Sequence, residues 1–387
     1  MMKLFCDVTP LTGNLAGIGV YTKNLLQGIH RLDPGIEFHC GIRSLNWKLI
    51  REFHMDYQNI YGFPVKIHHK LIPGRLTGKP GTTLSRLLNF KASDYDLIHM
   101  TASLCPIWMN FDSYRKAIFT VHDMYTFHHD LPLNHSWYEE EIRKKLPAQL
   151  QECAAVITVS EYSKKEIIHF TGIPAEKIHV IPNSVQWDPS DHYWENSTIL
   201  QQYQLENIPF FLSVSTLRPH KNYANLIRGF RKFCQSPDYH GERMLIVGIR
   251  QPDDAEVYDL IQSTPGVLHL SGIPAPDLKM LYHRAKGFFL ISFMEGFGIP
   301  LLEAMTCGTP CCYSSGTSLQ EIGRDAAFSV PPADIDAIAD QFAVFAEGGN
   351  AIKESVEKCR QIATEYTIDS VARKTLSLYH QVIREQQ

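Results

Sequence analysis

Residues 286–303 read KGFFLISFMEGFGIPLLE, and this stretch decides both the expected fold and the expected site. The segment from Lys286 to Ser292 is short and mostly apolar, which predicts a buried strand. Pro300 suits the first position of a helix, because its missing N–H would be unpaired there, so a helix should begin near Ile299. A strand, a glycine-containing loop and a helix in this order indicate an α/β fold, with the loop at the carboxyl end of the strand, where such sheets bind ligands.

The loop itself carries two glycines and is flanked by two glutamates. Gly296 and Gly298 let the backbone approach a ligand with its N–H groups at the positive end of the helix, which suits an anion such as phosphate. Glu295 precedes the glycines, and Glu303 is expected in the first helical turn. Since a carboxylate does not ligate phosphate without a metal but accepts hydrogen bonds from hydroxyls, the glutamates indicate a ribose or a sugar. The alternative is an ordinary loop, with Glu303 favourable to the helix dipole and Glu295 solvated.

Short apolar runs alternate with amphipathic stretches along the whole chain of 387 residues, a length that predicts two domains. In the first half the expected strands are Lys3 to Val8, Ile36 to Ile42, Asp96 to Met100, Ala117 to Val121, Ala154 to Val159 and Ile178 to Ile181. In the second half they are Phe210 to Ser215, Met244 to Val247, Val267 to Leu270, Gly287 to Ile291, Thr309 to Tyr313 and Ala326 to Ser329. Two successive βα arrays predict two Rossmann-like domains facing one another across a cleft. We expect these domains at residues 1–187 and 208–367, a polar linker over 186–207, and a C-terminal helix within 368–387.

Composition is that of a soluble globular protein, with 44% hydrophobic residues, 20% charged residues and a net charge of −4. No apolar run approaches the roughly 18 residues that span a bilayer, and the chain start reads as a strand rather than a signal peptide. We therefore expect a cytoplasmic protein. The nine cysteines include no Cys-x-x-Cys pair, and no His-x-x-x-His pattern falls on an expected helix, so we expect neither a disulfide framework nor a protein-bound metal.

The segment 43–91 is strongly basic, with nine Lys or Arg residues against two acidic ones, and large apolar side chains are interleaved among them. Such a surface can dock on anionic lipid headgroups or on a lipid-linked diphosphate, which would place the protein peripherally at the inner face of the membrane. Nucleic acid fits less well, because no recognition motif accompanies the charge. A solvated, loop-rich surface is the alternative.

Glycines also follow the first expected strand, at Gly13, Gly17 and Gly19. This segment precedes a helix and can cradle a phosphate or admit a ligand at the cleft, although a plain turn is equally compatible. Thr22 stands where the Gly-x-Gly-x-x-Gly pattern needs its third glycine, which argues against a dinucleotide cofactor. His122 ends another strand at the same sheet edge. Its imidazole can bind a sugar hydroxyl or a leaving oxygen, or it can be a hydrogen-bonded core residue.

In the second half, residues 213–222 read SVSTLRPHKN and end a strand just before a helix. Arg218 and Lys221 are cations that can neutralise a departing diphosphate at this position. The alternative is a surface turn.

Together these residues resemble the retaining nucleotide-sugar glycosyltransferases of the GT-B fold, family 4, and are similar to the bacterial mannosyltransferases that build surface polysaccharides such as the O-antigen of lipopolysaccharide. The strongest element is the Glu-x7-Glu signature from Glu295 to Glu303. The supporting segments are Gly17 to Thr22, Val121 to Asp123, Val159 to Ser163, Ile181 to Asn183, Pro219 to Asn222, and Ser315-Gly316 with Glu321. The resemblance covers most of the chain.

The resemblance implies a role for each matching position. Glu303 would bind the ribose hydroxyls, Glu295 the donor sugar and Lys221 the diphosphate, and the amides of Phe297 and Gly298 would contact sugar and phosphate. Gly17 and Gly19 would close on the donor, and His122 would contact the transferred sugar. Backbone groups around Gly248 and Ile273 would contact the base.

Two positions depart from the family pattern. Many relatives carry an arginine where this chain has Thr216, and Arg218 lies near enough in sequence to substitute for it. Ser184 replaces a common glycine.

The resulting hypothesis is a metal-independent enzyme that transfers a sugar, with retention, from a nucleotide diphosphate donor to a hydroxyl of a lipid-linked or growing polysaccharide. GDP-mannose is favoured as the donor by the resemblance alone. Two alternatives stay open. A glycosidase would also use two carboxylates but needs no phosphate-binding elements. The Thr216 departure suggests instead a catalytically idle nucleotide-sugar-binding subunit of a glycan assembly complex.

Overall fold

A computed structural model describes residues 2–11, 17–42, 62–69, 91–102, 111, 113–128, 137–185, 187, 192–250 and 255–386. The chain divides into two compact units. Unit 1 comprises Met1–His128, His135–Gln186 and Thr367–Gln387, and the main part of unit 2 is Trp187–Tyr366. Most of the basic segment 43–91 lies outside the described residues, so its contact with lipid stays a prediction. Among the described helices, none combines the length and the apolar character needed to cross a bilayer.

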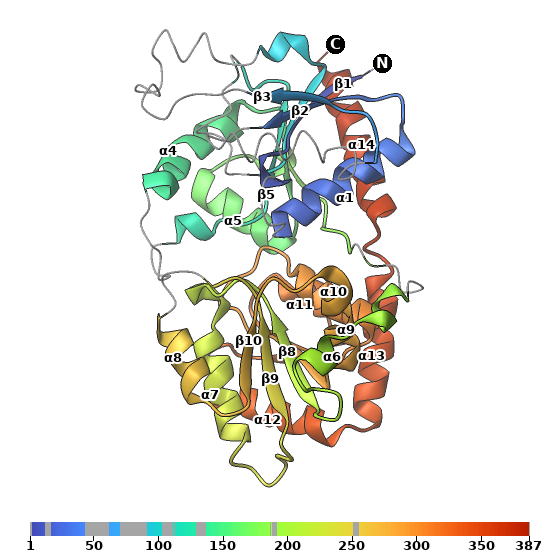
Figure 1. The fold of residues 1–387 in the computed structure, drawn as a ribbon. Helices are drawn as coiled ribbons and strands as arrows, with labels where there is room; N and C mark the ends of the chain where they lie inside the picture. The colour runs from blue at the N-terminus through green and yellow to red at the C-terminus, as the bar shows by residue number, and fades with distance from the viewer. Residues whose placement is uncertain are drawn as a thin grey trace. The chain divides into compact units, whose positions relative to one another are not determined.

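Unit 1 is built on a seven-stranded parallel sheet in the order β3-β2-β1-β4-β5-β6-β7. The strands are β1 (Lys3–Asp7), β2 (Glu37–Ile42), β3 (Lys66–His69), β4 (Leu97–Met100), β5 (Ala117–Val121), β6 (Ala155–Thr158) and β7 (Ile178–Val180). The helices are α1 (Gly17–Leu32), α4 (Trp137–Glu152), α5 (Glu161–Thr171) and the C-terminal α14 (Ile368–Glu385). These helices lie around the sheet (Figure 1). Hydrophobic side chains from both faces of the sheet form the core against them.

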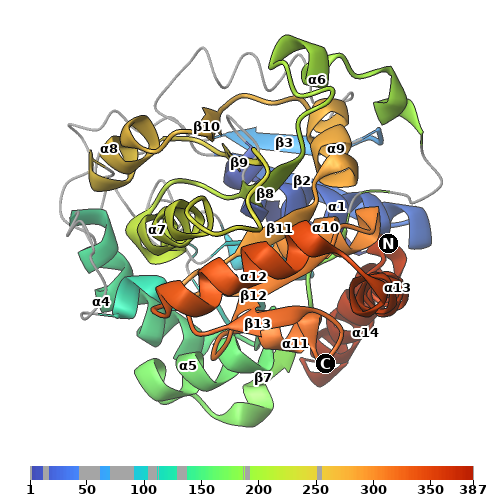
Figure 2. The same cartoon turned by 90° about the horizontal axis from the view of Figure 1, so that it is seen from below.

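Unit 2 is built on a six-stranded parallel sheet in the order β10-β9-β8-β11-β12-β13. Its strands are β8 (Phe210–Val214), β9 (Arg243–Val247), β10 (Val267–Leu270), β11 (Gly287–Leu290), β12 (Cys311–Ser314) and β13 (Phe328–Val330). Its helices are α6 (Ile199–Gln202), α7 (Tyr223–Phe233), α8 (Ala255–Ser263), α9 (Ala275–Arg284), α10 (Ile299–Cys307), α11 (Leu319–Gly323), α12 (Ile335–Glu347) and α13 (Asn350–Ala363). Helices α7 and α12 pack against each other on one face of this sheet (Figure 2).

The expected strands are confirmed, and one strand among the described residues was missed. All twelve predicted segments overlap an observed strand. The missed strand is β3, whose sequence KIHH is short and polar and lies at the edge of the sheet beside β2. Because an edge strand with an exposed lysine lacks the apolar run that marks a buried strand, periodicity did not reveal it.

Side-chain hydrogen bonds cap the starts of two helices of unit 1. Ser160 precedes α5 in an extended conformation, and its hydroxyl accepts a hydrogen bond from the backbone N–H of Ser163 at 3.0 Å. The hydroxyl of Thr367 accepts one from the N–H of Ser370 at 3.1 Å at the start of α14. Each cap satisfies an N–H that would otherwise be unpaired in the first helical turn.

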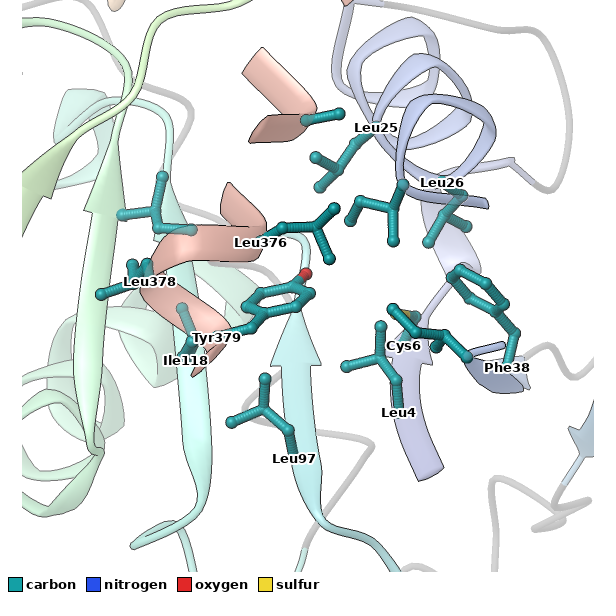
Figure 3. Close-up of a cluster of buried hydrophobic side chains, with 14 of the residues drawn as sticks. Leu4, Cys6, Leu25, Leu26, Phe38, Leu97, Ile118, Leu376, Leu378 and Tyr379 are labelled. Atoms are coloured by element: carbon teal, nitrogen blue, oxygen red, sulfur yellow. The ribbon is translucent and has the colours of Figure 1, made fainter. Parts of the chain in front are cut away.

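The C-terminal helix α14 follows unit 2 in sequence but packs in the core of unit 1. Figure 3 shows its Leu376, Leu378 and Tyr379 among Leu4, Cys6 and Leu97 of the sheet and Leu25 and Leu26 of α1. The sequence predicted a C-terminal helix here, while the sheet that buries one of its faces was not readable from the sequence.

The polar segment 186–207 was predicted as a linker, and its described residues fold onto unit 2. The short helix η6 (Tyr193–Asn196) and α6 both contact α9. The ring of Trp194 stacks on His283 with centroids 4.1 Å apart, and the Ser197 hydroxyl donates to the Asp277 carboxylate at 2.5 Å. The described part of this segment therefore extends the second unit instead of serving only as a connection.

Candidate functional site

In unit 2 the predicted site residues follow the strands around the point where strand order reverses. The sheet runs from β8 outward to β9 and β10 on one side and to β11, β12 and β13 on the other. The loops after β8 and β11 consequently diverge at this switch point, which is where open parallel sheets bind ligands. Lys221 follows β8, and Glu295 follows β11.

Two hydrogen bonds tie these two loops together on either side of Lys221. The side-chain amide of Asn222 donates to the carbonyl of Ile291 at 2.9 Å. The backbone N–H of Phe293 donates to the carbonyl of His220 at 2.8 Å. Asn222 adopts the left-handed conformation, with φ of 58°, and its amide also donates to the carbonyl of Pro332 at 2.6 Å. Lys221 is thus held by both neighbours against the loop that carries Glu295.

Lys221 and Glu295 form an ion pair, with Nζ and Oε1 2.8 Å apart. Their side chains are 15% and 10% exposed, so the pair is largely shielded from solvent and weakly screened. An ammonium group carries three N–H donors, of which Glu295 takes one, so Lys221 can also donate to an anion. The structure therefore places beside each other the two residues for which the family resemblance implied diphosphate and sugar contacts.

Two serines that the sequence reasoning missed hold Glu295 in place. The hydroxyl of Ser292 donates to Glu295 Oε1 at 2.8 Å, and the hydroxyl of Ser318 donates to the backbone carbonyl of Glu295 at 2.7 Å. Both serines are buried. The position of Ser292 at the end of an apolar strand was a usable signal, whereas Ser318 reaches the loop only through the tertiary fold.

Glu303 lies in the second turn of α10 and not in the first, because the helix begins at Ile299 as expected and Glu303 is its fifth residue. The hydroxyl of Tyr282 donates to Glu303 Oε2 at 2.9 Å. Burial raises the pKa of the Glu303 carboxyl to about 7, and the bond from Tyr282 opposes this increase. Glu303 is therefore a carboxyl group whose charge changes near neutral pH.

The remaining predicted donor-site residues of unit 2 lie at the same edge of the sheet. Arg218 is exposed and precedes the short helix η7 (Pro219–Lys221). Gly248 follows β9, and a Cβ atom there would lie 1.7 Å from the carbonyl oxygen of Ser215, so only glycine allows this approach between the loops after β8 and β9. Ile273 follows β10 and is half-buried.

Cationic neighbours affect the histidine of this loop. Burial, Lys221 and Arg218, in this order, lower the pKa of His220 to about 2. His220 is therefore neutral at physiological pH, and the positive charge of the loop is carried by Lys221 and Arg218.

Gly296, Phe297 and Gly298 are buried in the loop before α10. Gly298 caps the helix with φ of 107°, a conformation that L-residues rarely adopt, and a Cβ atom there would lie 2.2 Å from Leu319 Cδ2. The ring of Phe297 packs on Tyr366, with centroids 5.7 Å apart. The loop conformation thus depends on a glycine at position 298.

Gly298→Ala should destabilise the protein by about 2–3 kcal/mol, because the substitution adds backbone strain and a clash with the buried Leu319 side chain. Gly316→Ala is a matched control, since Gly316 has φ of 80° but a Cβ atom added there would meet no other atom within 4 Å. The control should cost only about 1 kcal/mol. Equal losses of unfolding free energy in urea titrations of the two variants would contradict the predicted clash.

In unit 1 the predicted glycines lie within a helix. Gly17 is the first residue of α1 and Gly19 is the third, so both belong to its first turn. Residue 13 of the same glycine-rich segment lies outside the described residues. The predicted closure of Gly17 and Gly19 on a donor stays a prediction.

His122 directly follows β5 and is buried. Its Nε2 lies 2.9 Å from the carbonyl oxygen of Thr101, and because a carbonyl only accepts, Nε2 carries the proton and Nδ1 is the acceptor nitrogen. Burial lowers the pKa of His122, so the ring is neutral. Tyr21 packs edge-on against it at 4.7 Å. The fold holds His122 in one orientation, and its contact with a sugar stays a prediction.

Solved structures share this architecture. The Anabaena protein HepE, solved in complex with UDP and glucose, matches 98% of this chain and 100% of its own, with a TM-score of 0.74 at 16% identity. The sucrose-phosphate synthase of Thermosynechococcus elongatus matches over 100% of both chains, with a TM-score of 0.74 at 18% identity. At such identities the likeness shows the fold alone, which is the GT-B fold of glycosyltransferases.

Family models match both halves of the chain: Glycosyltransferase Family 4 over residues 15–188 and Glycosyl transferases group 1 over residues 196–366. The chain belongs to these GT-B glycosyltransferases. It is 32% identical to O-antigen chain mannosyltransferase B of Escherichia coli, over 58% of this chain and 59% of that protein. It is also 32% identical to the O-antigen chain mannosyltransferase RfbU of Salmonella typhimurium, over 57% of this chain and 58% of that protein. The alignments thus span less than two thirds of these relatives.

Proposed function

We propose that this protein transfers mannose from GDP-mannose to a hydroxyl of a lipid-linked or growing polysaccharide, with retention of the anomeric configuration. The observation that carries the proposal is the ion pair of Lys221 and Glu295 at the switch point of the unit 2 sheet. In this pair Lys221 is a cation that can bind a diphosphate, and Glu295 beside it is a carboxylate that can accept hydrogen bonds from sugar hydroxyls. The relatives named as O-antigen mannosyltransferases support mannose and a polysaccharide acceptor.

The charges that form during sugar transfer determine what the site has to stabilise. Breaking the bond between the anomeric carbon and the diphosphate oxygen leaves negative charge on the diphosphate and positive charge on the sugar ring. Lys221, Arg218 and the loop amides stabilise the diphosphate, and one such preorganised donor contributes about 3 kcal/mol. The acceptor oxygen attacks the same face of the sugar, and its proton passes to an oxygen of the leaving phosphate. This route needs no covalent enzyme intermediate and no metal.

The idle-subunit alternative rests on Thr216, which stands where many relatives carry a phosphate-binding arginine. Arg218 is exposed two residues further on, and its charge acts on His220 together with that of Lys221. A guanidinium is therefore present in the loop. We propose that Arg218 replaces the missing arginine, which favours the enzyme over the idle subunit.

Nucleotide-induced stabilisation tests the proposed donor. GDP should raise the melting temperature more than UDP or ADP, because a ligand that binds the native state stabilises it. At a concentration about 100 times the dissociation constant, the expected stabilisation is about 2.7 kcal/mol. UDP is a serious competitor, since HepE was solved with UDP and glucose.

Product formation distinguishes the proposed classes. GDP-mannose and an acceptor should yield GDP and a mannosylated product. A larger increase in melting temperature with UDP than with GDP would overturn the GDP assignment. Nucleotide binding without product from any nucleotide sugar and acceptor would favour the idle subunit. If none of the nucleotides raised the melting temperature, the donor site itself would be rejected.

A further inference from the structure

Tyr282 connects the candidate nucleotide site to the interior of unit 2. It lies on α9, its side chain is fully buried, and its hydroxyl donates to Glu303 Oε2 at 2.9 Å. Burial raises the pKa of the phenol well above its usual value, so Tyr282 remains a neutral donor at every pH of interest. No motif marked this tyrosine in the sequence.

The Tyr282 ring is held on two sides, and its backbone is held as well. Trp187 packs against it edge-on with centroids 5.2 Å apart, and Phe288 of β11 packs against it with centroids 5.5 Å apart. The Thr309 hydroxyl donates to the carbonyl of Tyr282 at 2.7 Å. These contacts to the ring and the backbone hold the phenol oxygen in its position beside the Glu303 carboxyl.

We propose that Tyr282 is a positioning residue for Glu303: its hydroxyl occupies Oε2, so that Oε1 is the atom that accepts hydrogen bonds from the ribose of the nucleotide. This inference rests on the proposed function, because it assigns a partner to the carboxylate that the function uses. A donor to a carboxylate also stabilises its ionised form, which accepts stronger hydrogen bonds from hydroxyls than the protonated form does.

The other titratable groups around Glu303 come from the elements that pack against α10. Those that act on Tyr282 or on Cys307, the two groups that Glu303 itself influences, are Lys279 on α9, Cys307 on α10, Cys311 on β12 and Arg360 on α13. Burial and the Glu303 carboxylate raise the pKa of the Cys307 thiol, and Lys279 and Arg360 lower it by less. For Glu303 the resolved influences are burial, which raises its pKa to about 7, and the bond from Tyr282, which lowers it.

The sign of the pH effect follows directly. In the wild type, nucleotide affinity should rise as the pH increases through the Glu303 pKa near 7, because the carboxyl ionises. Removing the Tyr282 hydroxyl takes away the group that favours ionisation, so the midpoint of the rise should move to higher pH. A purely structural role would weaken binding by the same factor at every pH.

The experiment measures GDP and UDP dissociation constants by calorimetry between about pH 6 and about pH 9 for the wild type, Tyr282→Phe, Glu303→Gln and Tyr313→Phe. Tyr313→Phe is the matched control, because Tyr313 is also buried in unit 2 and donates to a backbone carbonyl, that of Arg324, at 2.8 Å. Melting temperatures without ligand show whether each variant is folded.

Tyr282→Phe should weaken binding about tenfold near pH 7 and recover toward the wild-type affinity at about pH 9. Glu303→Gln should bind weakly with no midpoint near pH 7, and Tyr313→Phe should follow the wild type. A Tyr282→Phe profile parallel to the wild-type profile would overturn the inference alone. Absence of nucleotide binding by the wild type at every pH would overturn the proposed function and this inference with it.

Discussion

Lys221→Met should lower the turnover number by about two to three orders of magnitude, because it removes the cation that stabilises the departing diphosphate. Methionine keeps the length of the side chain, so packing around the loop is largely retained. Glu295 keeps its bond from Ser292, and the loops stay tied through Asn222 and the backbone of Phe293. The measurement is the initial rate of GDP release from GDP-mannose with acceptor at saturating substrate.

The control for this experiment is Lys232→Met. Lys232 on α7 also pairs with a carboxylate, that of Asp336, at 2.6 Å, but the two side chains are 53% and 73% exposed. Exposed ion pairs contribute little to stability, so this variant should keep the wild-type rate and melting temperature. A Lys221→Met enzyme that retains more than about a tenth of the wild-type rate would contradict the assigned role of Lys221.

Tyr379→Ala should destabilise unit 1 by about 3–5 kcal/mol, although the residue lies near the end of the chain. The Tyr379 ring is fully buried in the cluster of Figure 3, between α14 and the unit 1 sheet. Its hydroxyl is hydrogen-bonded to Nδ1 of His99, whose Nε2 lies 2.7 Å from the Thr120 hydroxyl. Burial lowers the pKa of His99 to about 3, so its ring is neutral. In Tyr379→Ala this ring would lose its hydrogen-bond partner and face a cavity.

Tyr379→Phe separates the contribution of the buried ring from that of the hydrogen bond to His99. It keeps the ring and removes only the hydrogen bond to His99, so its cost should be about 1–3 kcal/mol. Urea unfolding should be followed with probes in each unit, because a chain with two units need not unfold in a single transition. If Tyr379→Ala shifted only the transition of unit 2, the assignment of α14 to the unit 1 core would be contradicted.

The sequence was informative wherever a local pattern encodes a local structure. The apolar runs predicted the strands, and Pro300 predicted the start of α10 at Ile299. The same patterns brought the candidate residues to one edge of the unit 2 sheet, because carboxyl ends of parallel strands share an edge. The ion pair of Lys221 with Glu295 followed neither from spacing nor from composition, since 74 residues separate the two side chains.

By itself, the sequence determined the described strands of the two sheets except β3, the loops that follow them and the residue types that those loops present at the site. Tertiary structure alone decided which sheet buries α14, that Tyr282 bonds to Glu303, and that the described residues between 187 and 207 pack on α9. The physical reason is that hydrophobic periodicity reports that a face must be buried but not against which partner. A hydrogen bond between distant residues depends on the packing of all the elements between them.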